Sequence, residues 1–173
     1  MAHIFSLNRA TLLRRFAVYV VIAYGKHDTM LYIGKTGDNR EGCNPIISRC
    51  GNHFSYNKIH SQVRNKLKDH EERDYTYVFD HFGAYFKDKN KRQSSIDEIN
   101  EMERWLNQEV QASIKSVNNC KLVNAFTAKG YVSKVEKEKR ASFRTVTNRL
   151  KIAGIVTGVT EELKANHSFN RTR

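Results

Sequence analysis

The sequence predicts a small α+β protein in which a central, mostly antiparallel three-stranded sheet is flanked by helices and followed by a basic helical extension. Two apolar runs joined by a polar turn, residues 16–23 and 30–33, predict two neighbouring strands. Apolar residues at helical spacing over residues 94–117 predict a helix that covers the sheet. The 173 residues, 39% of them hydrophobic, suffice for a single core. One compact domain with appendages is therefore expected.

The first two strands are predicted to form a hairpin. Phe16–Ala23 (FAVYVVIA) is apolar, rich in β-branched residues and too short for a typical helix, which favours a buried strand. Met30–Ile33 (MLYI) is a second run of the same kind. The intervening YGKHDT is polar and contains Gly25, as a turn requires. The two strands are therefore expected to be antiparallel.

Loop chemistry follows Gly34, and helices are expected after it. The segment KTGDNREGCNP contains two glycines and Pro45, the only proline of the chain, which suits the first position of a helix. We expect that helix over 46–54. A second helix is expected over 57–68, because its apolar residues share one face. Those residues are Ile59, Val63 and Leu67.

The third strand and the longest helix come next. Residues 75–82 alternate, with Tyr75, Tyr77 and Phe79 on one face of the predicted strand. A charged loop is expected over 87–93. Ser94 or Ser95 can then cap a helix that ends near Val117. The apolar stripe of this helix is Ile99, Met102, Leu106, Val110, Ile114 and Val117.

The rest of the chain is predicted to be less regular. Asn118 and Asn119 are typical of a helix end, and the apolar segment 121–126 (KLVNAF) either returns to the sheet or lies at its edge. Residues 133–150 are dense in Lys, Arg and Glu and predict a peripheral, basic helix. The residues from Ala165 onward are expected to be loose.

Charge and composition narrow the functional classes. The formal net charge of +12 favours binding to polyphosphates, largely through counterion release, although it also suits a surface that serves solubility. An odd number of cysteines without CxxC spacing indicates a reducing compartment. The sequence has no apolar run long enough for a membrane span, and its first residues do not fit a secretory signal. We expect a soluble, cytoplasmic protein that is neither secreted nor membrane-bound.

Two tyrosines and a later helix carry the candidate chemistry. Tyr19 lies in the first predicted strand and Tyr32 in the second, so a hairpin brings two phenols near each other. A strand tyrosine is most often a core residue. Lys35 follows Tyr32-Ile33-Gly34, however, and Arg49 is followed four residues later by His53, on the same face of the predicted helix.

This ordered set resembles the GIY-YIG nuclease family, which includes restriction and homing endonucleases. Ala17-Val18-Tyr19 stands in place of GIY, Tyr32-Ile33-Gly34 matches YIG, and RCGNHF carries Arg49 and His53, with a helical glutamate and an asparagine further on. The resemblance covers about two thirds of the chain. Ala17 and Val18 depart from the family pattern, the hairpin turn is longer, and Arg40 is an alternative arginine. The resemblance implies an N-terminal arm (1–15), a catalytic domain (16–130) and a basic helical extension with a tail (131–173).

The long helix offers several candidates for the glutamate. Glu103 is favoured because Leu106 and Val110 follow it at three and seven residues, which places it beside the buried stripe. Glu101 is the second choice. The other glutamates of this helix are Glu98 and Glu109. Asn124 is favoured as the asparagine because it lies in an apolar segment, whereas Asn118 and Asn119 resemble a helix end.

The resemblance also implies the roles of these residues. Glu103 would hold one Mg²⁺, for which Mn²⁺ can substitute, and Arg49 would clamp the scissile phosphate. Lys35 would add a second positive charge there or lower the pKa of a neighbouring tyrosine. Tyr19 would be the general base. Tyr32 and His53 would position water and phosphate, with Gly34 and Asn124 in support.

The expected partner is double-stranded DNA, and cleavage of both strands requires a homodimer or repeated nicking. Alternatives are a non-catalytic nucleic-acid-binding module and an RNA-acting nuclease. A zinc site from Cys43, Cys50, His53 and His60 is disfavoured by its spacing. A restriction-type, phage-encoded or mobile-element nuclease is the favoured interpretation. The expected nucleic-acid-binding residues are Arg40, Lys58, Arg64, Lys91, Arg92, Arg140 and Arg144.

Overall fold

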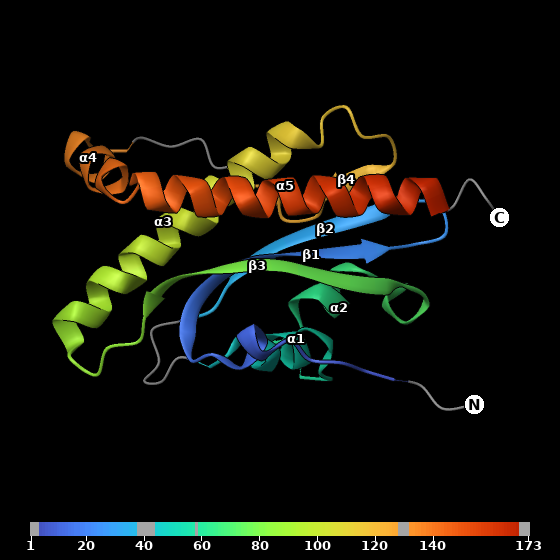
Figure 1. The fold of residues 1–173 in the computed structure, drawn as a ribbon, viewed down its shortest axis with the longest axis horizontal. Coiled ribbons are helices and arrows are strands. Elements are labelled where there is room, and N and C mark those ends of the chain that lie inside the picture. Colours follow the sequence, from blue (N-terminus) through green and yellow to red (C-terminus); the bar gives the residue numbers. More distant parts are fainter. Residues whose placement is uncertain (1–3, 38–43, 58, 128–131, 170–173) are drawn as a thin grey trace.

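A computed structural model describes residues 4–37, 44–57, 59–127 and 132–169. The fold belongs to the predicted α+β class: one sheet lies between two layers of helices (Figure 1). The strand order is β3-β1-β2-β4. The strands are β1 (Arg15–Tyr24), β2 (Thr29–Lys35), β3 (Asp74–Ala84) and β4 (Cys120–Leu122).

The sheet has four strands, so the prediction of three was wrong in number. Strand β1 pairs antiparallel with β2, as predicted, and also with β3, while the added β4 pairs parallel with β2. Strand β4 overlaps the start of the apolar segment that was expected to return to the sheet or its edge. Its three residues are too few to give a periodic signal in the sequence, and its position follows from pairing with β2.

Strand β1 lies in the middle of the sheet and is buried on both faces. Helices α3 (Lys89–Ser113) and α5 (Val146–Phe169) cover one face, and α1 (Ile46–Phe54) and α2 (Gln62–Lys66) lie on the other (Figure 1). Successive side chains of a strand point to opposite faces. Tyr19 therefore faces α1, while Val18 and Val20 face α3 and α5.

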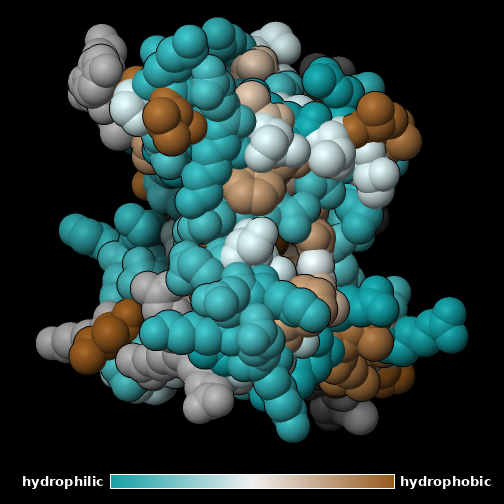
Figure 2. Space-filling model, turned by 90° about the vertical axis from the view of Figure 1, so that its left-hand side faces the viewer, coloured by the Kyte–Doolittle hydropathy of each residue, from teal (hydrophilic) through white to brown (hydrophobic). Residues whose placement is uncertain are grey.

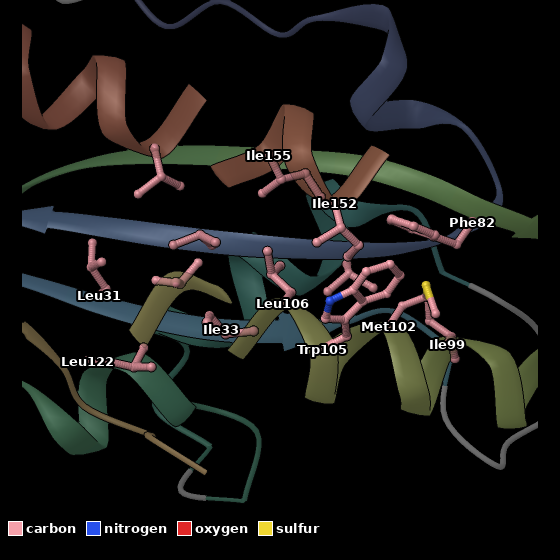
Figure 3. Close-up of a cluster of buried hydrophobic side chains, with 14 of the residues drawn as sticks. Leu31, Ile33, Phe82, Ile99, Met102, Trp105, Leu106, Leu122, Ile152 and Ile155 are labelled. Atoms are coloured by element: carbon pink, nitrogen blue, oxygen red, sulfur yellow. The ribbon is translucent and has the colours of Figure 1, made fainter. Parts of the chain in front are cut away.

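The larger core lies between the sheet and helices α3 and α5 (Figure 3). Met102 and Leu106 of α3 meet Ile152 and Ile155 of α5 there, and all four side chains are nearly inaccessible to water. Burying a side chain of this size stabilises a fold by about 1.5–3 kcal/mol. Helix α5 is thus an integral part of the core.

Helix α3 begins earlier than predicted. The side chain of Asp88 accepts a hydrogen bond from the Lys91 backbone N–H at 2.8 Å, so the cap is Asp88 and not Ser94 or Ser95. Much of the charged segment expected to be a loop is therefore helical. The helix ends at Ser113, a few residues before the expected end near Val117. The left-handed conformation of Asn119, with φ of 56°, occurs where the chain turns toward β4.

Two other helix predictions and the expected loose tail required changes. Helix α1 has the predicted bounds, but the predicted helix over 57–68 is reduced to α2, because Ile59 is exposed and does not join Val63 in the core. The single helix expected over 133–150 is two: α4 (Lys134–Ser142) and the start of α5. Helix α5 then continues to Phe169, past the point where a loose tail was expected.

Short 3-10 helices complete the described fold: η1 (Arg9–Leu12) precedes β1, and η2 (His70–Glu72) precedes β3. Within the described residues, none of the helices has the length and apolar character needed to cross a bilayer.

Candidate active site

The first pair of the candidate site is Tyr19 of β1 and His53 of α1. The Tyr19 phenolic oxygen lies 2.7 Å from the His53 Nε2, and both residues are buried, at 0% and 1% exposure. Helix α1 places His53 over the sheet because its N-terminal residue Ile46 is also buried against that face. The hydrogen bond therefore joins a strand to the helix that covers it.

The second tyrosine lies on the same face of the sheet. Tyr19 stands opposite Gly34 in the β1–β2 register and Val21 stands opposite Tyr32, so the two phenols are diagonal neighbours. The Tyr32 ring lies 5.1 Å from the His53 ring, measured between centroids. His53 thus contacts both tyrosines.

Gly34 has a steric role in this arrangement. A Cβ atom at this position would lie 2.5 Å from the Tyr19 phenolic oxygen, closer than non-bonded atoms can approach. Gly34 carries no such atom, so the Tyr19 ring can cross the backbone of β2 and reach His53. The glycine of the predicted motif is thereby explained by packing.

Burial determines the protonation states of the three rings. It raises the pKa of Tyr19 well above its ordinary value, and that of Tyr32 to about 12. It lowers the pKa of His53 to about 4, and the nearby charge of Arg49 acts in the same direction. At neutral pH both phenols are protonated and the imidazole is neutral. When the imidazole carries its proton on Nδ1, the Tyr19 O–H donates to His53 Nε2.

Arg49 lies one helical turn before His53 and near both phenols. Its charge acts to lower the pKa of Tyr19 and of Tyr32, against the larger effect of burial, and it also forms a hydrogen bond with Tyr19. The four-residue spacing in α1 therefore places a guanidinium and an imidazole on the same side of the helix.

Glu103 of α3 completes the group from the other layer of helices. Its Oε2 accepts a hydrogen bond from the Lys35 Nζ at 3.1 Å, at the end of β2. Its negative charge contributes to raising the pKa of both Tyr19 and Tyr32, after the larger effect of burial, which places it within electrostatic range of the phenols.

The other glutamates of α3 are engaged elsewhere. Glu101, the second choice from the sequence, is buried and forms ion pairs with Arg104 and Arg144. Glu109 accepts a hydrogen bond from the Trp105 indole, and Glu98 accepts one from the Asn148 side chain. Of the glutamates considered, only Glu103 adjoins the tyrosines.

Asn124 braces the motif from the segment after β4. Its Oδ1 accepts a hydrogen bond from the Ile33 backbone N–H at 3.0 Å, and its Nδ2 donates to the Ile33 carbonyl at 2.7 Å. The residue between Tyr32 and Gly34 is thus held through both backbone groups. Asn107 of α3 in turn donates to the Asn124 carbonyl at 3.1 Å.

Sequence reasoning missed Asn107. This buried amide also accepts a hydrogen bond from the Phe126 backbone N–H at 2.8 Å. One signal was present: Asn107 is a polar residue within the apolar stripe, four positions after Glu103 and therefore on the same helix face. Helix α3 therefore carries both the carboxylate and the amide that fixes the Asn124 segment.

The donor set suits a magnesium ion better than a zinc ion. Within the described ranges no group of three or more His, Cys, Asp or Glu side chains could hold a metal together. Glu103 Oε1 has no hydrogen-bond partner among the described residues, and Glu103 lines a pocket of about 320 Å³. Mg²⁺ commonly uses one or two carboxylates and keeps several waters, so these groups fit it.

The predicted nucleic-acid-binding residues are distributed over several elements. Arg40 and Lys58 lie outside the described residues. Arg64 lies over the Tyr56 ring at 4.7 Å, and Lys91 is exposed near the start of α3. One side of the molecule is mostly hydrophilic, with its most hydrophobic side chains scattered (Figure 2).

Three other arginines of that set have protein partners. Arg92 donates to the Tyr85 hydroxyl, and Arg140 donates to Glu136 at 2.7 Å. Arg144 donates twice to the buried Glu101, at 2.9 and 2.7 Å, and stacks over Trp105. The Arg144 guanidinium neutralises a buried carboxylate and joins the α4–α5 junction to α3, and its contact with nucleic acid stays a prediction.

Comparisons with protein-family models, curated proteins and solved structures find no match to this chain.

Proposed function

We propose that this protein is a metal-dependent endonuclease that hydrolyses phosphodiester bonds of double-stranded DNA through a site of the GIY-YIG type. The observation that carries the proposal is the arrangement of two phenols, a guanidinium and a helical carboxylate from four separate elements around one point. The net charge of +12 supports a polyanionic substrate. We favour a restriction-type nuclease, or one encoded by a phage or a mobile element.

Cations of the chain would hold the scissile phosphate. Arg49, as a planar donor, suits two of its oxygens, and Lys35 adds a point charge beside Glu103. Glu103 would bind one Mg²⁺, for which Mn²⁺ can substitute. When bound, this ion supplies positive charge near the leaving 3′ oxygen.

The Tyr19–His53 hydrogen bond suggests how a proton is taken from the attacking water. Burial opposes a free phenolate at Tyr19, whose pKa it raises. The phenol can instead pass its own proton to neutral His53 Nε2 while its oxygen accepts the proton of water. Tyr19 is fully buried, so water must gain access to its hydroxyl before this proton transfer can occur.

The decisive experiment measures cleavage of plasmid and phage DNA, and of a matched RNA duplex, with Mg²⁺ or with EDTA. Glu103→Gln and Arg49→Ala are each expected to reduce Mg²⁺-dependent DNA cleavage by about 10³-fold or more, with DNA binding largely retained. Glu109→Gln in α3 and Arg149→Ala in α5 are matched controls for helix charge and should keep most of the cleavage activity. Full activity of both site variants, or cleavage in EDTA, would contradict the proposal.

Cleavage of both strands also bears on assembly. The described residues hold one such site per chain, so a double-strand break requires two copies on the DNA or successive nicks. We propose that two copies act together on duplex DNA. Linear product that forms without a nicked intermediate, at a rate rising with the square of protein concentration, would support this, and single nicks alone would oppose it.

A further inference from the structure

A pocket adjoins Glu103 on the side formed by α3 and the segment that follows β4. It has a volume of about 320 Å³, within the range of small-molecule sites. The proposed phosphate chemistry does not use most of its lining. The lining residues are Asn100, Glu103, Arg104, Asn107, Asn124 and Phe126.

Two asparagines form a fixed wall of this pocket. The Asn124 side-chain amide is hydrogen-bonded to the Ile33 backbone. The Asn107 side-chain amide is hydrogen-bonded to the Asn124 carbonyl and the Phe126 N–H. These bonds tie the segment after β4 to α3. The position of Phe126 relative to Glu103 is therefore set by hydrogen bonds through Asn107, which lies one helical turn beyond Glu103.

The other lining groups remain available for recognition. The Asn100 side chain makes no hydrogen bond with another residue in the described part of the chain, so its amide can donate and accept. Phe126 exposes 46% of its surface although it is a large apolar residue. The Arg104 guanidinium is fixed by its pair with Glu101 and lies 5.8 Å from the centre of the Phe126 ring.

This combination matches the chemistry of a nucleobase. Aromatic rings and guanidinium planes stack on unpaired bases, and a side-chain amide pairs with the donors and acceptors of a base edge. Neither group suits an aliphatic ligand, and a ligand of high negative charge would be opposed by the carboxylate of Glu103. A base is flat and uncharged, and it arrives attached to the phosphate that the neighbouring site is built to hold.

We propose that this pocket receives an unstacked base of the nucleotide next to the scissile phosphate, stacked on Phe126 and hydrogen-bonded by Asn100. The proposal rests on the proposed function for the position of the phosphate, since Glu103 belongs to both sites. A base that is already unpaired needs no unpairing energy before it enters. The protein should therefore prefer DNA with a bulged or mismatched nucleotide to fully paired DNA.

The test measures binding of the full chain to short, fluorescently labelled DNA duplexes by anisotropy in EDTA, which prevents metal-dependent cleavage. One duplex has a single bulged adenine, and its partner has an abasic bulge with the same flexibility but no base. The wild-type protein should bind the adenine bulge roughly tenfold more tightly, since a stacked base contributes about 1–3 kcal/mol. Phe126→Leu should remove this preference, and Phe126→Tyr should restore it.

Phe86→Leu is the matched control, because Phe86 is similarly exposed, at 40%, but does not line the pocket. Equal binding of the two bulged duplexes by wild type, an unchanged preference in Phe126→Leu, or the same loss in Phe86→Leu would each overturn the proposal. Phe126 is on the surface, so the variant should fold, which circular dichroism checks.

The same proteins are then assayed with Mg²⁺, which separates the two proposals. A preference for the adenine bulge that depends on Phe126, in a protein that cuts no nucleic acid, supports the base pocket and refutes the nuclease. Cleavage by wild type, together with a preference for the adenine bulge that does not depend on Phe126, supports the nuclease and refutes the base pocket.

Discussion

The two faces of strand β1 are equally buried but differ in chemistry. Toward α3 and α5 the strand presents Phe16, Val18, Val20 and Ile22, which pack among other apolar side chains. Toward α1 and α2 it presents Tyr19 and the smaller Val21 and Ala23.

That second face contains a hydrogen-bonded phenol and imidazole with a guanidinium beside them. An apolar face stabilises the fold without directional bonds, whereas buried polar groups must be satisfied and have shifted pKa values. The comparison teaches that one strand can support stability on one side and reactive groups on the other. Glu103, by contrast, comes from α3 in the apolar layer, and it meets Lys35 at the end of β2.

The largest expected effect tests whether the apolar face acts through stability alone. Ile155→Ala in α5 removes a side chain that is 2% exposed, and it should lower the free energy of unfolding by about 2–5 kcal/mol. Urea denaturation measures this change. Leu150→Ala, an exposed position of the same helix, should change it by less than about 0.5 kcal/mol. A loss of cleavage activity in folded Ile155→Ala protein would contradict the separation of the two faces.

The next effect is a pH dependence that belongs to the polar face. The pKa of His53 falls from 6.5 to about 4 on folding, so the unfolded chain binds the extra proton between these values. The neutral imidazole therefore stabilises the fold above about pH 6.5, and this contribution, at most about 3 kcal/mol, is lost as the pH falls toward 4. Urea denaturation at pH 7 and pH 4.5 should show a steeper loss for wild type than for His53→Gln.

His81 supplies the control for that measurement, because burial lowers its pKa also, while it lies in β3 outside the site. The free energy of unfolding of His81→Gln should still show the part of the pH dependence that His53 causes. Equal pH dependence in wild type and His53→Gln would show that the imidazole is not held neutral by burial.

Tyr19→Phe separates chemistry from packing on the polar face. The variant keeps the ring and loses the hydroxyl that bonds His53. DNA cleavage should slow by about 100-fold, the usual scale of a general base, while the free energy of unfolding falls by only about 1 kcal/mol. Tyr24→Phe, at the other end of β1 and bonded to Glu162, should leave cleavage unchanged. Comparable rates for wild type and Tyr19→Phe would exclude Tyr19 from proton transfer.

The smallest effect concerns the connection between the two layers. Asn107→Ala leaves the Asn124 carbonyl and the Phe126 N–H without their partner, which should cost about 1–2 kcal/mol of stability. Cleavage should slow less than in Tyr19→Phe, because Asn107 positions other residues. Gln111→Ala, which removes a donor to Asn107 Oδ1, should have a weaker effect still. If Asn107→Ala lost as much cleavage activity as Glu103→Gln, Asn107 would have a direct role in the reaction.

The central part of the fold follows from local sequence patterns. The strands β1 and β2 are continuous apolar runs, and α1 starts directly after Pro45, so their positions are evident from neighbouring residues. Helix α5 was missed because its buried residues, among them Ile152 and Ile155, alternate with glycines and threonines that weaken the helical signal. Strand β4 was uncertain because only its pairing with β2 defines it.

The candidate site could be predicted in part for the same reason. Tyr19, Gly34 and the Arg49–His53 pair belong to short motifs with fixed spacing, and the structure brings them together. The choice among the glutamates followed from helix geometry, although the sequence could not show that Arg144, 43 residues away, occupies Glu101. Contacts between distant segments, such as Asn107 with Asn124, have no local signature.

Helix α3 carries the Glu103 carboxylate and the apolar stripe of the larger core on one continuous backbone. A single residue inserted or deleted between Ile99 and Glu103 would turn these two residues by about 100° relative to each other. Either Ile99 would leave the core or Glu103 would point away from Lys35. The packing of the core and the position of the Glu103 carboxylate together fix the length of this segment. A change in length here should be far more damaging than one in the turn between β1 and β2.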